Sequence, residues 1–347
     1  MPYALFVRGN SSFNIRDGSA LLNDRAKKTA AAVFGNGPKD VDKIGKGVAR
    51  QYGKGDNGFN VCSCQFAIHY FFKNSDTLKG FLKNVAQSTK INGYFIGTAY
   101  DGKTLFDKLK KIKSGDSLQL VDQGKKVWEV IKVYTPETFE DNSSSIGYEI
   151  NVYQESINQY ISEYLVNFNY LDRVMEAYGF KVISREEANE MGLPEGSGLF
   201  RELFINMLDE IKRNKFKETL YGEAPYMSTI EKEISFINRY FIYKKIRDVN
   251  IEKIHLELGE YEEAVAEREK KDTEKAIVVA KEEEIKTNKL RVKKLSKKLL
   301  LVAATEAVDE PVKQIEEIIE KKKESKQQVK QVKKAKKLLI VESDEED

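Results

Sequence analysis

The sequence has 347 residues, of which 41% are hydrophobic and 10% aromatic, enough for at least one well-covered core. Its 58 basic and 55 acidic residues leave a formal net charge of +3, which argues against a uniformly basic nucleic-acid coat but allows local basic patches. No apolar run approaches the length of a membrane span, and the first residues lack the pattern of a signal peptide. We therefore expect a soluble, intracellular protein without membrane contact.

Cysteine and histidine are scarce. Cys62 and Cys64 stand two positions apart in an expected strand, where side chains share a face but lie too far apart to bridge easily. This spacing indicates reduced thiols. With only two histidines, His69 and His255, the chain cannot assemble a zinc cluster from Cys and His.

The composition changes near Lys245. All Phe, Trp and Cys residues precede it, and the remainder is dominated by Lys and Glu. We therefore expect one domain at residues 1–245 and a helical or disordered tail at residues 246–347. Two pieces of the tail, residues 293–302 and 333–341, each join a basic run to an aliphatic run. A tail that tethers RNA or docks a partner is the alternative to a passive one.

The chain opens with an apolar run at residues 3–8, which predicts a buried strand. Asn10 and Ser11 follow in a polar turn. In open α/β sheets ligands gather at the carboxyl ends of strands, so this turn is either a cofactor contact or an ordinary Gly-Asn turn.

A helix is predicted at residues 20–34, before a loop rich in Gly and Lys that runs to Gly58. Residues 45–47 read Gly-Lys-Gly, without the upstream Gly and the following Ser or Thr of a P-loop, so a nucleoside-triphosphate site is excluded. The loop is either solvated or a contact for RNA phosphates. The basic side chains in question are Lys43, Lys46, Arg50 and Lys54.

Strands and helices then alternate, which indicates βαβ units and a parallel sheet. An apolar run starts at Phe59, amphipathic helices are predicted at 76–86 and 102–112, and a buried strand at 91–98. Two segments with period-two alternation, 127–134 and 146–153, predict an antiparallel hairpin inserted into this order. The remaining predictions are a helix at 157–178, a strand at 180–183, mainly helix at 185–220 and a last strand at 235–245.

Residues 59–70 read FNVCSCQFAIHY and resemble the "FD-x-x-SCQF-x-x-HY" motif of the mRNA cap guanine-N7 methyltransferases of cells and large DNA viruses. Three further segments are similar to later motifs of that family, in the same order. They are the strand at 93–98, the "E-[FY]-L-V" motif at 163–166, expected at a helix start, and the terminal strand at 239–241.

The resemblance implies a partial Rossmann-like class I methyltransferase sheet and methyl transfer from S-adenosylmethionine to N7 of the 5′ cap guanine of mRNA. It implies no catalytic acid or base, only proximity and electrostatics. By the same resemblance, His69, Glu163 and Tyr240 hold the cap guanine. Gln65 and Tyr70 line the S-adenosylmethionine pocket, and Asn10 stands where the family has an Asp that contacts the adenine.

These residue types suit that chemistry. A carboxylate such as Glu163 can accept hydrogen bonds from both N1–H and the N2 amino group of guanine, and a good bidentate pair gives about 1–3 kcal/mol of discrimination. It would also stabilise the base as methylation makes it cationic. Because N7 has a free lone pair, alignment for in-line displacement suffices, and His69 and Tyr240 would position the base.

One family feature is missing from the sequence: the Gly-rich first strand, turn and helix, with the acidic residue after the second strand. We expect the C-terminal portion of a capping methyltransferase, with capped mRNA as substrate and an upstream polypeptide or capping-enzyme subunit completing the cofactor site. A non-catalytic, methyltransferase-like cap- or RNA-binding or stimulatory subunit is the alternative. The nucleus or a cytoplasmic viral factory is the expected location, and a location in the virion also agrees with this expectation.

Overall fold

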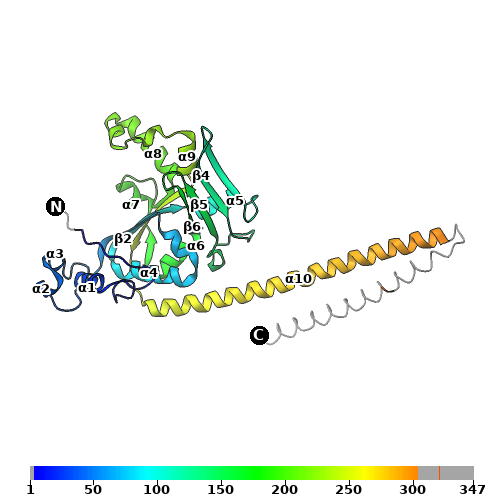
Figure 1. The fold of residues 1–347 in the computed structure, drawn as a ribbon, viewed down its shortest axis with the longest axis horizontal. Coiled ribbons are helices and arrows are strands. Elements are labelled where there is room, and N and C mark those ends of the chain that lie inside the picture. Colours follow the sequence, from blue (N-terminus) through cyan, green and yellow to red (C-terminus); the bar gives the residue numbers. More distant parts are fainter. Residues whose placement is uncertain (1–3, 304–319, 321–347) are drawn as a thin grey trace. The chain divides into compact units, whose positions relative to one another are not determined.

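The computed structural model describes residues 4–303 and residue 320. The chain falls into two compact units, Met1–Glu260 and Tyr261–Asp347 (Figure 1). In the second unit the described chain is helical to Ala303, as part of helix α10 (Ile251–Ala303). The repeated piece at 333–341 lies outside the described residues.

The first unit is built on a mixed sheet. Strand β1 (Phe59–Gln65) pairs in parallel with β2 (Thr89–Tyr100), and helix α4 (Ser75–Ser88) connects them, as the alternating pattern predicted. The order continues through β9 (Asn238–Lys245) to β7 (Phe180–Val182), and both of these pairings are antiparallel. The predicted α/β class is confirmed, and so are the strands at 180–183 and 235–245.

One face of this sheet is buried. Phe95, Phe241 and Tyr243 project from β2 and β9 into a core that is completed by α4 and by α6 (Phe168–Ala177). Each fully buried aromatic or aliphatic side chain contributes about 1.5–3 kcal/mol. Gly97 lets the layers approach, because a Cβ atom there would lie 2.3 Å from both Cys64 O and the Phe241 ring. The opposite face carries the polar residues of the candidate site.

The predicted inserted hairpin is part of a larger sheet. Segments 127–134 and 146–153 do form paired antiparallel strands, β4 (Lys125–Lys132) and β5 (Glu149–Gln154). Strands β3 (Ser117–Asp122) and β6 (Gln159–Tyr164) extend them to four antiparallel strands. The inner face packs on helix α5 (Gly102–Leu109) through a second core that includes Trp128, Val130, Ile150, Leu105 and Leu109.

The helix predicted at 157–178 is wrong in its first part. Residues 159–164 form β6, and α6 begins only after Asn167, whose side chain accepts a hydrogen bond from Tyr170 N. The chain turns at Asn158, which has a φ of 56°, and then pairs back on β5. Glu163 therefore lies on a strand, facing the same side as Ile150.

The strand predicted at 3–8 is also wrong for the described residues 4–8. The side chain of Phe6 is 93% exposed, and no described strand pairs with this segment. An apolar, β-prone sequence becomes a strand only where another strand supplies its hydrogen bonds. The helix predicted at 20–34 forms from Asp24 to Val33 as α1.

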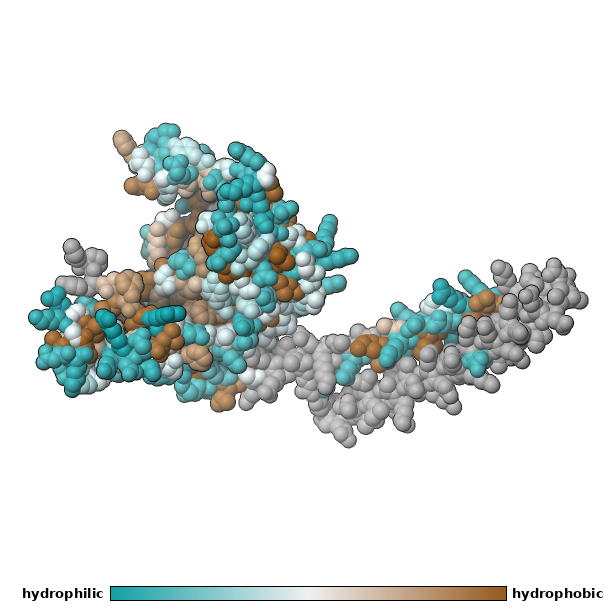
Figure 2. Space-filling model, viewed as in Figure 1, coloured by the Kyte–Doolittle hydropathy of each residue, from teal (hydrophilic) through white to brown (hydrophobic). Residues whose placement is uncertain are grey.

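The remaining elements are helices and one short strand. Figure 2 shows mainly hydrophilic residues on the viewed face of the first unit, with apolar residues in separate groups. The predicted Gly- and Lys-rich loop contains α2 (Val41–Ile44) and α3 (Lys46–Ala49), and the segment predicted as mainly helical contains α7 (Arg185–Glu190), β8 (Ser197–Leu199) and α8 (Phe200–Arg213). Helix α9 (Thr229–Ser235) precedes β9.

Candidate functional site

The candidate site begins where β1 ends. Gln65 is its last residue, and Phe66 then adopts a φ of 49°, which is rare for a bulky side chain and costs of order 1–3 kcal/mol. The backbone N–H of Phe66 still donates to Thr98 O at 2.9 Å. This sharp turn leads directly into the 3₁₀ helix η1 (Ile68–Lys73), which carries His69 and Tyr70. The strained turn therefore gathers polar groups at the carboxyl edge of the sheet.

His69 and Glu163 face each other inside the protein. His69 Nε2 lies 3.7 Å from Glu163 Oε1, and the two residues are 4% and 8% exposed. Within the described part of the chain, three of their polar atoms have no hydrogen-bond partner. These atoms are Nδ1 and Nε2 of His69 and Oε2 of Glu163. A buried polar group left unpaired costs about 1–3 kcal/mol. These atoms are therefore suited to a polar ligand that enters between them.

Burial shifts the protonation of both groups. Desolvation raises the pKa of Glu163 to about 7 and lowers the pKa of His69 to about 4. His69 is thus a neutral imidazole at neutral pH, with one N–H donor and one acceptor nitrogen. Glu163 is close to its midpoint, so a ligand that donates hydrogen bonds would favour its ionised form.

Two tyrosines adjoin this pair. The ring of Tyr70 packs edge-on against His69 with centroids 4.2 Å apart, and Tyr70 remains 42% exposed. Tyr100 is 8% exposed, and its hydroxyl oxygen accepts hydrogen bonds from Trp128 Nε1 and Gln154 Nε2, both at 3.0 Å. The pKa of each tyrosine is raised by burial and further by the charge of Glu163.

Sequence analysis missed Tyr100. It stands at the carboxyl end of β2, the position that should attract attention in a parallel pair of strands. That position is the one local signal that could have found it, because the contacts of Tyr100 come from distant strands.

Gln65 and Tyr240 lie in a row across three strands. Gln65 is paired with Thr98 in register, and Thr98 is paired with Tyr240, so the three side chains share one face. Thr98 Oγ1 donates to Gln65 Oε1 at 2.9 Å. The hydroxyl of Tyr240 donates to Glu195 O at 3.0 Å, and no described contact joins it to Glu163. Tyr240 therefore lies closer along this face to Gln65, which the family resemblance assigns to the cofactor pocket, and its predicted contact with the cap guanine stays a prediction.

Asn10 is not brought to this edge by any described contact. Its side-chain oxygen accepts from Ser12 N within its own turn at 3.0 Å. Asn84 of α4 holds that turn by donating to Ser11 O and Phe13 O. The role of Asn10 in binding adenine stays a prediction.

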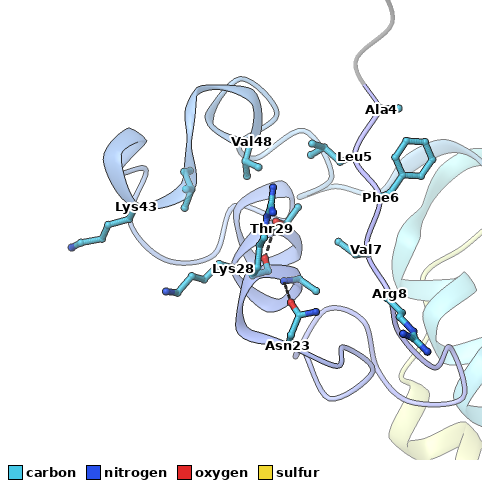
Figure 3. Close-up of a pocket in the computed structure, with 13 residues that line it drawn as sticks. Ala4, Leu5, Phe6, Val7, Arg8, Asn23, Lys28, Thr29, Lys43 and Val48 are labelled. Atoms are coloured by element: carbon cyan, nitrogen blue, oxygen red, sulfur yellow. Dashed lines mark hydrogen bonds between the residues drawn. The ribbon is translucent and has the colours of Figure 1, made fainter.

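A cavity of about 700 Å³ lies elsewhere, bounded by residues 4–8, α1, α2 and α3. Figure 3 shows Leu5 pointing toward Val48 across the gap, whereas Lys28 and Lys43 point outward. None of the six predicted site residues lines it. The RNA-phosphate role of Lys43 and its basic neighbours stays a prediction.

No group of three His, Cys, Asp or Glu side chains among the described residues could hold a metal ion. None of the helices described is both long and apolar enough to span a membrane.

Residues 21–246 match the family model described as the mRNA (guanine-N(7))-methyltransferase domain. The chain belongs to this family of methyltransferase domains.

Individual relatives agree with the family. The chain is 25% identical over 220 residues to a probable mRNA-capping enzyme of Acanthamoeba polyphaga mimivirus, covering 56% of this chain and 18% of that protein. It is 26% and 25% identical to the mRNA cap guanine-N(7) methyltransferases of Candida glabrata and Saccharomyces cerevisiae, covering 54% of this chain in each case and 44% and 42% of those proteins. The matched region therefore spans less than half of each of these relatives.

Among solved structures, a S-adenosylmethionine-dependent methyltransferase from Clostridium acetobutylicum aligns with a TM-score of 0.24 and 14% identity, covering 37% of this chain and 50% of that one.

Proposed function

We propose that this chain binds the guanine of the 5′ mRNA cap and takes part in transferring a methyl group from S-adenosylmethionine to N7 of that base. The observation that carries the proposal is the buried pair of His69 and Glu163, whose polar atoms lack partners in the described structure. The chain belongs to the cap guanine-N7 methyltransferase family, and the cap guanine carries polar groups that could pair with those atoms.

Guanine recognition follows from the Watson–Crick edge of the base. N1–H and the N2 amino group are adjacent donors, and the carboxylate of Glu163 offers two acceptor oxygens. The neutral ring of His69 positions the base beside it. Because adenine presents an acceptor at N1, it would leave the carboxylate unpaired and would be rejected.

The chemistry requires alignment more than proton transfer. N7 attacks with its own lone pair, so the residues need only hold the base in line and stabilise the charge that develops on it. A buried carboxylate that holds N1–H and the N2 amino group would also supply that field, which is strong in a low-dielectric pocket.

The residues present fit only part of the cofactor. Bound S-adenosylmethionine supplies the electrophilic methyl group. Gln65 and Tyr70, at the carboxyl edge of β1, are the side chains that would contact it. The Gly-rich turn and following acidic residue of the family are not found in the sequence before β1.

We further propose that another polypeptide segment completes the cofactor site. In the described structure β1 pairs only with β2, so its other edge is open, and Val61 on this strand is 50% exposed. An open edge of this kind accepts a further strand. The proposed place of action is the nucleus or a viral factory, where capped transcripts are made.

The deciding experiment is methylation of capped RNA with labelled S-adenosylmethionine, using the chain alone and together with the N-terminal cofactor segment of a related enzyme. We expect N7 methylation in the reconstituted sample. Cap binding without methylation in any combination would favour a non-catalytic subunit, and the absence of both would contradict the proposal.

A further inference from the structure

Tyr100 is a buried polar residue that the proposed function has not used. Its hydroxyl oxygen already accepts two hydrogen bonds, from Trp128 and Gln154 at 3.0 Å each. A tyrosine hydroxyl has two acceptor positions and one hydrogen to donate. Both acceptor positions are therefore filled, and neither of the hydrogen bonds described for this hydroxyl uses its O–H.

The two donors to Tyr100 both come from the four-stranded sheet. Trp128 and Gln154 lie on neighbouring strands β4 and β5, and both are on the inner face of the four-stranded sheet. Register places Glu163 on that same face, opposite Ile150. Tyr100 itself shares a face of β2 with Thr98, two residues before it, and thus with Gln65.

The chain that follows Tyr100 meets the chain that follows Glu163, because Asp101 forms a β-bridge with Val166 and Gly102 N–H donates to Val166 O at 3.0 Å. Tyr100 therefore lies near the pair of His69 and Glu163. Within the described residues, the atoms of these three side chains left without a hydrogen bond are one carboxylate oxygen, the two imidazole nitrogens and the phenolic hydrogen. A ligand that satisfies them must offer donors to the carboxylate and an acceptor to the phenol, side by side. Guanine has this arrangement, since its O6 acceptor adjoins the N1–H and N2 donors.

We infer that Tyr100 is a specificity-determining residue whose O–H donates to O6 of the guanine that Glu163 holds by N1–H and N2. This inference rests on the proposed function. Together the two side chains read all three groups of the Watson–Crick edge, and Trp128 and Gln154 act as positioning residues that orient the phenol. Because the phenol is already held in place, its O–H loses little conformational entropy when the ligand binds.

The test measures equilibrium binding of two cap analogues to the full chain. One is GpppA, and the other carries 6-thioguanine in the capping position, which keeps N1–H and the N2 amino group but replaces O6 by sulfur, a weaker acceptor. We expect the wild-type chain to bind GpppA about tenfold more tightly than the thio analogue. Equal binding of the two by the wild-type chain would overturn the inference without any variant.

Tyr100→Phe removes only the hydroxyl. It should weaken GpppA binding by about tenfold. Binding of the thio analogue should change by less than about twofold, because its sulfur accepts only a weak hydrogen bond from Tyr100. Equal weakening of both analogues would show that the hydroxyl acts through packing alone. The matched control is Tyr134→Phe, since Tyr134 belongs to the same core and its hydroxyl has no partner there; this variant should bind like the wild type.

The failure of this inference can be distinguished from failure of the proposed function. If the wild type binds GpppA, Glu163→Ala abolishes binding and Tyr100→Phe leaves the preference for O6 intact, the inference alone is wrong. If the wild type binds neither analogue, both fail together.

Discussion

His69 Nε2 lies 3.7 Å from Oε1 of Glu163 in a buried space, yet the two residues do not form a hydrogen bond with each other. The separation is too long for a hydrogen bond, and burial favours the neutral form of each group. A stabilising ion pair would have pulled the two pKa values the other way. The pair is therefore better explained as a site held open for a ligand than as a structural salt bridge.

The first prediction concerns stability. The pKa of Glu163 is raised to about 7 in the folded protein, above its usual value of 4.5. The folded state holds this proton more tightly than the unfolded state, so stability falls as pH rises from about 4.5 to 7. Glu163→Gln should therefore raise the free energy of unfolding at pH 8 by up to about 3 kcal/mol, with no gain near pH 4. Denaturant titrations at the two pH values measure the difference.

Glu129 offers a control of opposite sign. Burial opposes its ionisation, but hydrogen bonds from Lys126, Ser117 and Tyr160 outweigh burial and lower its pKa to about 2. Its contribution is present above pH 4.5 and is lost as pH falls toward 2. Glu129→Gln should destabilise the protein at pH 8. If both variants shift stability in the same direction there, the explanation for Glu163 is wrong.

The second prediction is the pH dependence of cap binding. Guanine needs the ionised carboxylate, whose pKa in the free protein is about 7. GpppA should therefore bind about tenfold more weakly at pH 6 than at pH 8. His69 does not titrate in this range, because its pKa is lowered to about 4. Titrations with Glu163→Gln should give weak binding that is independent of pH; a persisting slope would assign the effect to another group.

The third prediction concerns a buried lysine. Lys245 is 6% exposed, and its ammonium donates to Ala86 O and Thr89 O at the C-terminal end of α4 and forms an ion pair with Asp248 at 2.7 Å. Lys245→Met would remove these interactions and should lower stability by about 1–3 kcal/mol. Lys244→Met is the matched control, because the neighbouring Lys244 is more exposed and its ammonium contacts the Glu187 carboxylate and the Tyr94 ring, not backbone carbonyls. Equal effects in thermal melts would contradict this assignment.

The fourth prediction tests the boundary expected at Lys245. Ile251 and Ile254, in the first turns of α10, are each 7% exposed and belong to the core of the first unit. A chain ending at Lys245 should lose about 3–6 kcal/mol relative to a chain ending at Glu260. Chemical denaturation of the two truncated chains measures this. If they are equally stable, the core ends where the composition changes.

Local pattern was enough to predict much of this fold. Helix α4 and strands β1, β2 and β9 each carry a clear apolar period, and the two alternating segments gave β4 and β5. The strand around Glu163 was missed because residues 159–164 (QYISEY) lack the period-two alternation of a strand and run on toward the apolar positions of α6. The segment at 4–8 was overpredicted because its sequence favours a strand that no described neighbour pairs with.

The candidate site was predictable to a similar extent. The motif at 59–70 led to His69. Glu163 lies 94 residues further along the chain, and only the family resemblance associated it with His69. Tyr100 depends on donors from two other strands, 28 and 54 residues away along the chain, so no local pattern marks it. Three-dimensional contacts between the two sheets were needed to find it.

The most direct measurement of the central claim is the affinity of GpppA for the wild-type chain and for Glu163→Gln at pH 8. We predict saturable binding by the wild type and a loss of about 10- to 100-fold in the variant, because the amide cannot accept both guanine donors. Circular dichroism at the same pH should show the variant folded and at least as stable as the wild type. Equal affinity of the two folded proteins would contradict the assignment of this pocket to the cap guanine.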